Sequence, residues 1–241
     1  MFDVRAYGDT GLRIQFGETI SETTNHTIRS FSYLLERTAI PGVVEWIPTY
    51  LDISILYDPY MLTYEQLKDK VYDLKDEMKG LYLPPRQIIH IPVYYGGESG
   101  PDLEYVASYN GLTTDEVIEI HTSRDYLIYM IGFTPGFPYL GGMSEKIATP
   151  RLKNPRSKTP AGSVGIAGVQ TGIYSMETPG GWQVIGRTPI KLYDERRDPS
   201  VLLQSGHSIR FQHVTKEEYH CIEKDIQNEC YTLEVREEET K

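Results

Sequence analysis

Alternating apolar and polar residues predict strands in the first part of the chain. Leu12, Ile14 and Phe16 alternate with polar neighbours, as in a strand that is buried on one face. Apolar residues at 43–47 and 53–57 predict two further strands, which are separated by a turn that contains Pro48.

Apolar residues spaced three and four apart predict two helices around these strands. Ser21 is a suitable N-cap for the first helix, whose apolar face carries Ile28, Phe31, Leu34 and Leu35. The second helix begins with a capping box, Thr63 and Gln66, and we expect Gly80 at its C′ position. Its apolar stripe indicates a core face and consists of Tyr64, Leu67, Val71, Leu74 and Met78.

A change of composition at Pro84-Pro85 marks a candidate domain boundary. Both strands and helices are expected before it, so we expect an α+β domain over residues 1–86. Residues 87–241 then form a second domain.

The second domain has the pattern of a β-barrel. Two short helices are expected between its first two strands, one near Pro101 and one starting at the capping box of Thr113. Another helix is expected after Thr215, which has the same cap. The expected strands are 88–94, 126–131, 190–193 and 208–214.

A stretch rich in glycine and proline interrupts this barrel pattern. Residues 132–189 hold eleven of the 21 glycines and seven of the 15 prolines. Glycine allows a backbone to approach a ligand closely, and proline fixes φ, so such density predicts a specific irregular backbone. Long structured loops in compact domains are commonly functional, and we therefore expect the site here.

The charge of this stretch differs from that of the whole chain. The chain carries 34 acidic and 24 basic residues, a net charge of −10, which argues against nonspecific nucleic-acid binding. Between Lys146 and Met176, however, there are five basic residues and no acidic one. This local positive field favours a small anionic ligand or an acidic partner surface, although a solvated basic loop remains an alternative. Arg151 and Arg156 are the strongest candidates, because a proline precedes each.

Several classes of site are excluded by missing motifs. The chain has no phosphate-binding P-loop, dinucleotide fingerprint, zinc-protease motif or serine-hydrolase elbow. Cys221 and Cys230 complete no zinc spacing, and free thiols are expected. Neither a signal peptide nor a membrane span is indicated, so we expect a cytoplasmic protein. The glycine-rich loops look like a ligand site but lack a complete set of catalytic residues. This suggests a subunit whose active site is completed by residues of another chain.

The segment from Thr178 to Gln183 is the leading candidate for ligand binding. Gly180 and Gly181 can form a nest of backbone N–H groups that holds a carboxylate, a phosphate or an oxyanion. Trp182 would form one wall, and Gln183 or Gln170 could bind an amide. The alternative is a tight turn with a core tryptophan. Two other polar residues of this region, Tyr174 and Arg187, make ligand binding a stronger alternative to the tight turn than the two glycines alone would.

His121 has two interpretations. At the end of a helix its protonated form is favoured by the helix dipole, but it could also transfer a proton toward the glycine-rich loops. Phe133, Phe137 and Tyr139 are expected mainly to pack in the core.

Several long motifs, in order along nearly the whole chain, closely resemble the KipI/PxpB family, also called allophanate hydrolase subunit 1. They are YGDTGLRIQFG from Tyr7, GFTPGFPYLGGM from Gly132, PRLKNPR from Pro150, PAGSVGIAGVQTGIY from Pro160 and TPGGWQVIGRTP from Thr178. Ser175-Met176 departs from the pattern, which would have Tyr-Pro there.

The resemblance implies an α+β N-terminal domain followed by a mainly-β, cyclophilin-like barrel. It also implies the PxpB-type component of an ATP-dependent 5-oxoprolinase, which works with PxpC-type (KipA-like) and PxpA-type partners to open 5-oxoproline to L-glutamate. ATP would be bound by a partner, and no cofactor by this chain alone. On this interpretation His121, Arg151 and Gln170 are catalytic. Substrate would contact Tyr174, Gly180, Gly181, Trp182, Gln183 and Arg187.

The same resemblance implies an alternative function of a different class. One member of the family inhibits a sporulation histidine kinase by binding its dimerisation helices, which requires no chemistry. Prolyl isomerase activity, suggested by the cyclophilin-like barrel, ranks third.

Overall fold

The computed structural model describes residues 2–132 and 134–237. The chain divides into two compact units between Pro84 and Pro85. The boundary expected from composition lay after residue 86, two residues further along. Phe133, which we expected in the core, lies outside the described residues.

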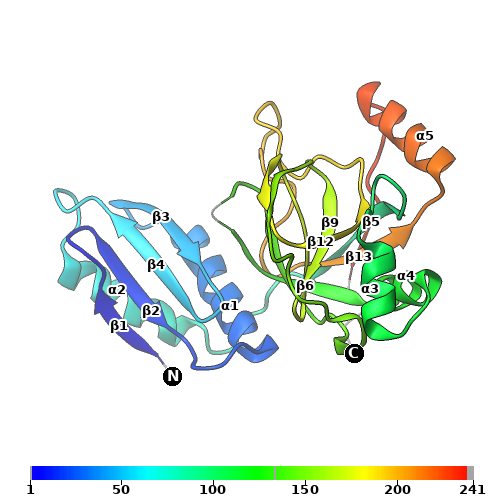
Figure 1. Ribbon diagram of the computed structural model, residues 1–241. Helices are drawn as coiled ribbons and strands as arrows, with labels where there is room; N and C mark the ends of the chain where they lie inside the picture. Colours follow the sequence, from blue (N-terminus) through cyan, green and yellow to red (C-terminus); the bar gives the residue numbers. More distant parts are fainter. Residues whose placement is uncertain (1, 133, 238–241) are drawn as a thin grey trace. The chain divides into compact units, whose positions relative to one another are not determined.

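The first unit is a four-stranded antiparallel sheet with helices packed on one face (Figure 1). The strand order is β1-β2-β4-β3, and Leu12 of β2 and Ile55 of β4 are paired in register and fully buried. The elements are β1 (Asp3–Ala6), β2 (Gly11–Gln15), α1 (Glu22–Thr38), β3 (Val43–Pro48), β4 (Asp52–Tyr57) and α2 (Tyr64–Glu77).

The expected helix starts are confirmed in this unit. The Ser21 side chain accepts a hydrogen bond from the backbone N–H of Thr24, and Thr63 and Gln66 form the capping box of α2. The expected position of Gly80 was wrong. The C-cap of α2 is Met78, and Gly80 adopts its positive φ of 80° beyond the helix end.

The second unit is a nearly closed barrel of mixed strands. The order is β10-β9-β12-β5-β13-β6-β7, with β14 beside β5, and β7 and β10 lie against each other across the remaining gap. β13 runs parallel to β5, and the other pairs are antiparallel. The strands are β5 (Gln87–Tyr95), β6 (Asp125–Ile131), β7 (Pro138–Gly141), β9 (Ser163–Ala167), β10 (Gln170–Ile173), β12 (Gln183–Arg187), β13 (Ser208–His213) and β14 (Val235–Glu237).

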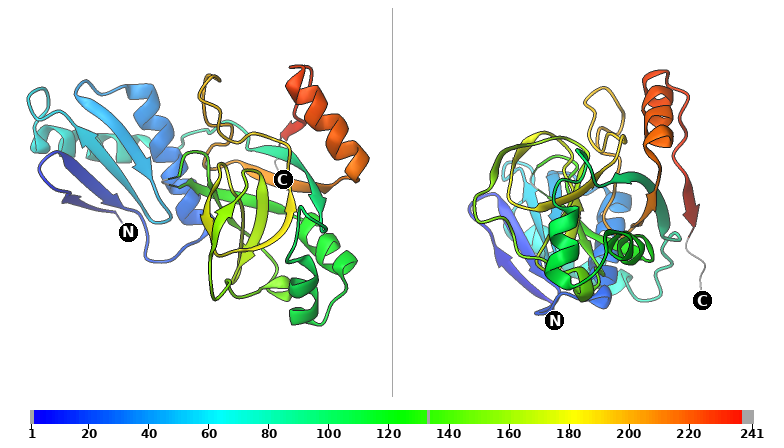
Figure 2. Two further views of the ribbon diagram at one scale, coloured as in Figure 1. Left: turned by 45° about the horizontal axis from the view of Figure 1, so that its top comes forward. Right: turned by 45° about the vertical axis from the view of Figure 1, so that its right-hand side comes forward.

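Three helices of the described chain contact strands of the barrel. α3 (Leu103–Asn110) contacts β12, and α4 (Thr114–Thr122) contacts β13. α5 (Lys216–Gln227) contacts β5 and lies away from α3 and α4 in all views (Figures 1 and 2). The expected capping boxes of Thr113 and Thr215 are both present.

Two expectations for the second unit were wrong. The glycine-rich stretch is not an irregular loop system: it contains β7, β9, β10, β12, the two-stranded ribbon of β8 (Arg156–Thr159) and β11 (Thr178–Gly180), and a 3-10 turn. Residues 190–193 do not form a closing strand. Ile190 instead donates its N–H to the Thr188 hydroxyl, and Tyr193 makes only an isolated bridge to Val201.

Candidate functional site

The glycine-rich segments of the second unit surround a small hollow, here called the aromatic hollow. Its volume is about 220 Å³. It is lined by Gly132, Thr134, Phe137, Tyr139, Arg151, Tyr174, Thr178, Pro179, Gly180, Gly181 and Trp182. Segments that are distant in the sequence meet here: residues before and in β7, Tyr174 directly after β10, and residues 178–182.

Three aromatic rings form the walls of the hollow. The Phe137 ring lies 5.7 Å from both the Tyr174 and the Trp182 ring centroid, edge to face in each case. Tyr174 and Trp182 are 6.3 Å apart in a similar arrangement. Together with Ala167, these rings form a cluster separate from the barrel core. Their packing fixes the shape of the walls before any ligand binds.

Arg151 is the cation of the aromatic hollow. Its guanidinium carbon lies 5.9 Å from the centroid of the Trp182 ring, and its side chain is exposed. Among the described residues, no acidic group or hydrogen-bond acceptor pairs with it. An unpaired arginine above an aromatic wall can bind a carboxylate or stabilise a developing negative charge.

Gln183 lies beneath the hollow instead of lining it. Its side chain is 2% exposed and donates from Nε2 to the carbonyl oxygen of Pro150 at 2.8 Å. This bond holds the backbone directly before Arg151. Gln183 is therefore placed to position Arg151, and not to contact a ligand as we expected.

The two glycines do not form the expected nest. Neither has φ in the left-handed region, and Gly180 belongs to β11. Gly180 instead leaves room for a side chain, because a Cβ there would lie 2.4 Å from the hydroxyl oxygen of Tyr174. Burial raises the pKa of that hydroxyl, partly offset by a hydrogen bond from the Trp182 backbone and by the charge of Arg151.

Arg156 is committed to a structural contact. One of its guanidinium nitrogens donates to both carboxylate oxygens of Asp102, at 2.6 and 2.8 Å. Asp102 also accepts the backbone N–H of Val184. Arg156, which with Arg151 was a candidate for binding an anion, is already neutralised by Asp102.

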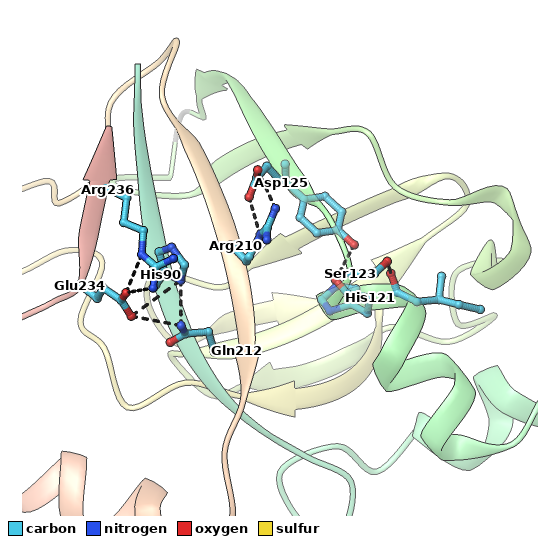
Figure 3. A network of polar contacts seen from close by, with 10 residues as sticks. His90, His121, Ser123, Asp125, Arg210, Gln212, Glu234 and Arg236 are labelled. Carbon is cyan, nitrogen blue, oxygen red and sulfur yellow. Dashed lines mark hydrogen bonds and ion pairs between the residues drawn. The ribbon is translucent and has the colours of Figure 1, made fainter. Parts of the chain in front are cut away.

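His121 is a fully buried residue of the barrel core, where α4 ends (Figure 3). Thr171 donates its hydroxyl proton to the Gly165 carbonyl, so it accepts from His121 Nε2–H at 2.8 Å. His121 Nδ1 then accepts from the Tyr95 hydroxyl, also at 2.8 Å. Burial lowers the pKa of His121 to about 3. The expected protonated form was therefore wrong, and the ring is neutral.

The structure brings some of the predicted site residues together and separates others. Arg151, Tyr174, Gly180, Gly181 and Trp182 line the aromatic hollow. The residues that do not line it are His121, Gln170, Gln183 and Arg187. Phe137 and Tyr139, which we expected mainly in the core, belong to its wall. The high density of aromatic and proline residues around Gly136 was the sequence feature that could have placed these two residues at a site.

Arg187 lines a different and larger cavity, the second hollow, of about 670 Å³. It is bounded by residues 161–162, 175–177, 187–191, 193–196, Tyr219 and Glu223. The two hollows share no lining residue. The segment from Tyr174 to Thr178 separates them, since its end residues line the aromatic hollow and its middle residues line the second.

Metal binding has no visible basis in the described part of the chain. No three histidine, cysteine, aspartate or glutamate side chains gather there as ligands. Cys221 and Cys230 are exposed free thiols, as expected. Within the same residues, no helix is long and apolar enough to cross a membrane.

Comparison with known proteins identifies the family. The family model of the carboxyltransferase domain, subdomain C and D, matches residues 2–203. The chain belongs to this family. The B subunit of 5-oxoprolinase from Bacillus subtilis (strain 168) is 42% identical over 234 residues, 93% of this chain and 98% of that protein. A protein with the same name from Escherichia coli O157:H7 is 46% identical over 173 residues, 71% of this chain and 78% of that one.

A solved structure supports the fold. TTHA0988 superposes with a TM-score of 0.74 at 36% identity, covering 88% of this chain and 40% of the longer TTHA0988 chain. The resemblance to the KipI/PxpB family and the two-part fold expected from the sequence are thus confirmed.

Proposed function

We propose that this chain is the B subunit of an ATP-dependent 5-oxoprolinase that opens 5-oxoproline to L-glutamate. The observation that carries the proposal is the match to a protein named as that component of 5-oxoprolinase over nearly the full length of both chains. Such a name implies partners, which we take to be the C and A subunits of the same enzyme. We place the complex in the cytoplasm.

In this proposal the aromatic hollow is one wall of a site that a partner chain completes. The hollow has aromatic walls and an unpaired arginine, but no acid–base pair of its own among the described residues. A lactam is a poor electrophile, and its ATP-dependent opening passes through an anionic activated species. Arg151 would stabilise that negative charge, and the rings of Phe137 and Trp182 would hold the five-membered ring.

ATP would be bound by a partner chain. The sequence has no phosphate-binding loop motif. The aromatic hollow would then contact 5-oxoproline and not ATP. Roles of His121 in proton transfer and of Gln170 in catalysis stay predictions, and both require contact with groups outside the aromatic hollow.

Reconstitution of the three-component complex tests the proposal. We expect ATP hydrolysis that depends on 5-oxoproline, with glutamate as product, and no such activity when this chain is omitted. Arg151→Met should lower kcat/KM at least about tenfold, because it removes a charge-assisted contact. The control is Lys153→Met, an exposed cation two residues away that does not line the hollow.

Two results would contradict the proposal in different ways. A complex without 5-oxoproline-dependent hydrolysis would remove the assigned function. An active complex in which both variants keep full activity would retain the function but remove the aromatic hollow from it. The alternative, inhibition of a sensor histidine kinase, stays a prediction, which an autophosphorylation assay with excess protein tests.

A further inference from the structure

The second hollow contains a cation without a counter-charge. Arg187, at the end of β12, is half-buried and donates from Nε to the carbonyl oxygen of Ala161 at 3.0 Å. No acidic side chain of the described chain forms an ion pair with it. Its two terminal guanidinium nitrogens therefore remain available as donors.

The other charges around this cavity are mostly paired. Glu177 binds Lys158 at 3.1 Å, and Asp194 binds Arg196 at 3.2 Å. Glu223 lies 3.5 Å from a ring nitrogen of His220, which pairs with it only when that ring is protonated, and no ion pair of Glu195 is found among the described residues. In the described part of the chain, the half-buried Arg187 guanidinium has only the Ala161 carbonyl as a partner, so an acidic ligand would supply the counter-charge that it lacks.

Two hydroxyl groups of the same cavity also lack partners. Ser175 is 7% exposed, and its buried Oγ forms no hydrogen bond in the described structure. Tyr219 of α5 also lines the cavity, and no hydrogen bond of its hydroxyl is found among the described residues. A buried hydroxyl is normally satisfied, so the unpartnered Oγ of Ser175 points to an acceptor that comes from outside the chain.

We propose that the second hollow binds a small carboxylic acid. Its carboxylate would lie on the guanidinium of Arg187 and accept hydrogen bonds from the hydroxyls of Ser175 and Tyr219. Four acidic residues, Glu177, Asp194, Glu195 and Glu223, line the same cavity, so they repel a doubly charged phosphate about twice as strongly as a single carboxylate. One unpaired cation instead matches one carboxylate.

This site is distinct from the proposed reaction site. The two cavities share no lining residue, and the binding is a property of this chain alone. The proposal does not rest on the assignment to 5-oxoprolinase. It gives a role to Ser175, the residue at which the sequence departs from the pattern of the family it resembles.

Calorimetric titration of the full chain tests the proposal with four probes. Propionate, L-glutamate and 5-oxoproline each carry a net charge of −1 with a carboxylate, whereas 2-pyrrolidinone has the lactam ring without it. We expect saturable binding of at least one acid and none of 2-pyrrolidinone. Arg187→Met should weaken that binding at least about tenfold and Ser175→Ala by about threefold to tenfold. Lys153→Met, an exposed cation that lines neither cavity, should leave it unchanged.

Amide chemical shifts provide a second measurement that does not depend on the variants. Addition of the binding acid should shift the amide signals of residues 175–177 and Tyr219. In the calorimetric titrations, Arg187→Lys should bind the acid more tightly than Arg187→Met. No binding of any of the three acids would overturn the proposal. So would shifts confined to residues 180–182 with loss of binding in Arg151→Met, because the acid would then occupy the aromatic hollow.

Discussion

Gly180 is required by its neighbours and not by its backbone conformation. An added Cβ would lie 2.4 Å from the Tyr174 hydroxyl oxygen and 2.6 Å from the Thr159 hydroxyl oxygen. Both side chains are buried and cannot move aside easily. At Gly181 the nearest atom to an added Cβ is 3.5 Å away, on the Pro155 ring, which is an ordinary contact. The two adjacent glycines therefore differ in their tolerance of a side chain.

We predict that Gly180→Ala lowers the free energy of unfolding by about 1–3 kcal/mol through overpacking. Gly181→Ala should change it by less than about 0.5 kcal/mol, as expected for a site with space. Urea unfolding of the two variants measures the difference. Equal stabilities would show that the Tyr174 side chain can shift, and that the wall of the aromatic hollow is not rigid.

The neutral His121 ring predicts a pH dependence of stability. Its pKa is about 3 in the folded chain, whereas the ordinary histidine pKa is 6.5. The unfolded chain binds the extra proton between these values, so stability is present above pH 6.5 and is lost as the pH falls toward 3. Between pH 7 and pH 5, His121 alone should lower the free energy of unfolding by about 2 kcal/mol.

Denaturant unfolding at the two pH values checks this prediction, with His121→Gln as the comparison. The variant removes the titrating group, so its own loss between pH 7 and pH 5 should be smaller by about 2 kcal/mol. Its absolute stability can be lower without affecting this comparison. Identical pH dependences would mean that His121 is not the group that is protonated.

At the scale of the elements, local signals identified helices better than strands. The capping boxes of Thr63, Thr113 and Thr215 gave the starts of α2, α4 and α5, because a cap needs only residues three apart. Strands β7 to β12 are three to five residues long, and all but β8 contain glycine, so no clear alternation is visible. Their pairing is set by barrel contacts that the sequence does not display.

The candidate site was predictable only where its residues follow one another. Gly180, Gly181 and Trp182 line the hollow together, and the nearby positive charge of Arg151 was visible in the composition. Arg187 lines the other cavity, because it lies at the opposite end of β12 from Trp182. Whether Arg156 is free or paired depends on Asp102, 54 residues away, which sequence alone could not reveal.

At the scale of the whole molecule, each unit has a core of its own. The core of the first unit joins α1 and α2 to the sheet and includes Phe31, Ile53 and Leu67. The barrel core is a separate cluster. A contiguous unit with its own core can fold alone, although a domain of this size has modest stability.

We therefore predict that fragments 1–84 and 85–241 fold separately. Each should give dispersed amide signals in NMR spectra and a cooperative unfolding transition. The matched control is a cut within the barrel, giving fragments 1–150 and 151–241, which divides the strand pair β9–β12 from β5 and should leave the second unit unfolded. A disordered fragment 1–84 would show that its core is not sufficient.

The five residues from Tyr174 to Thr178 act as a partition with a chamber on either side. Tyr174 and Thr178 belong to one chamber, and the three residues between them belong to the other. Exchanging a middle residue can thus reshape one chamber while the chemistry of its neighbour is kept. An insertion that lengthens the partition, however, would change the shape of both chambers at once. Neither chamber can therefore be enlarged on its own by lengthening this segment.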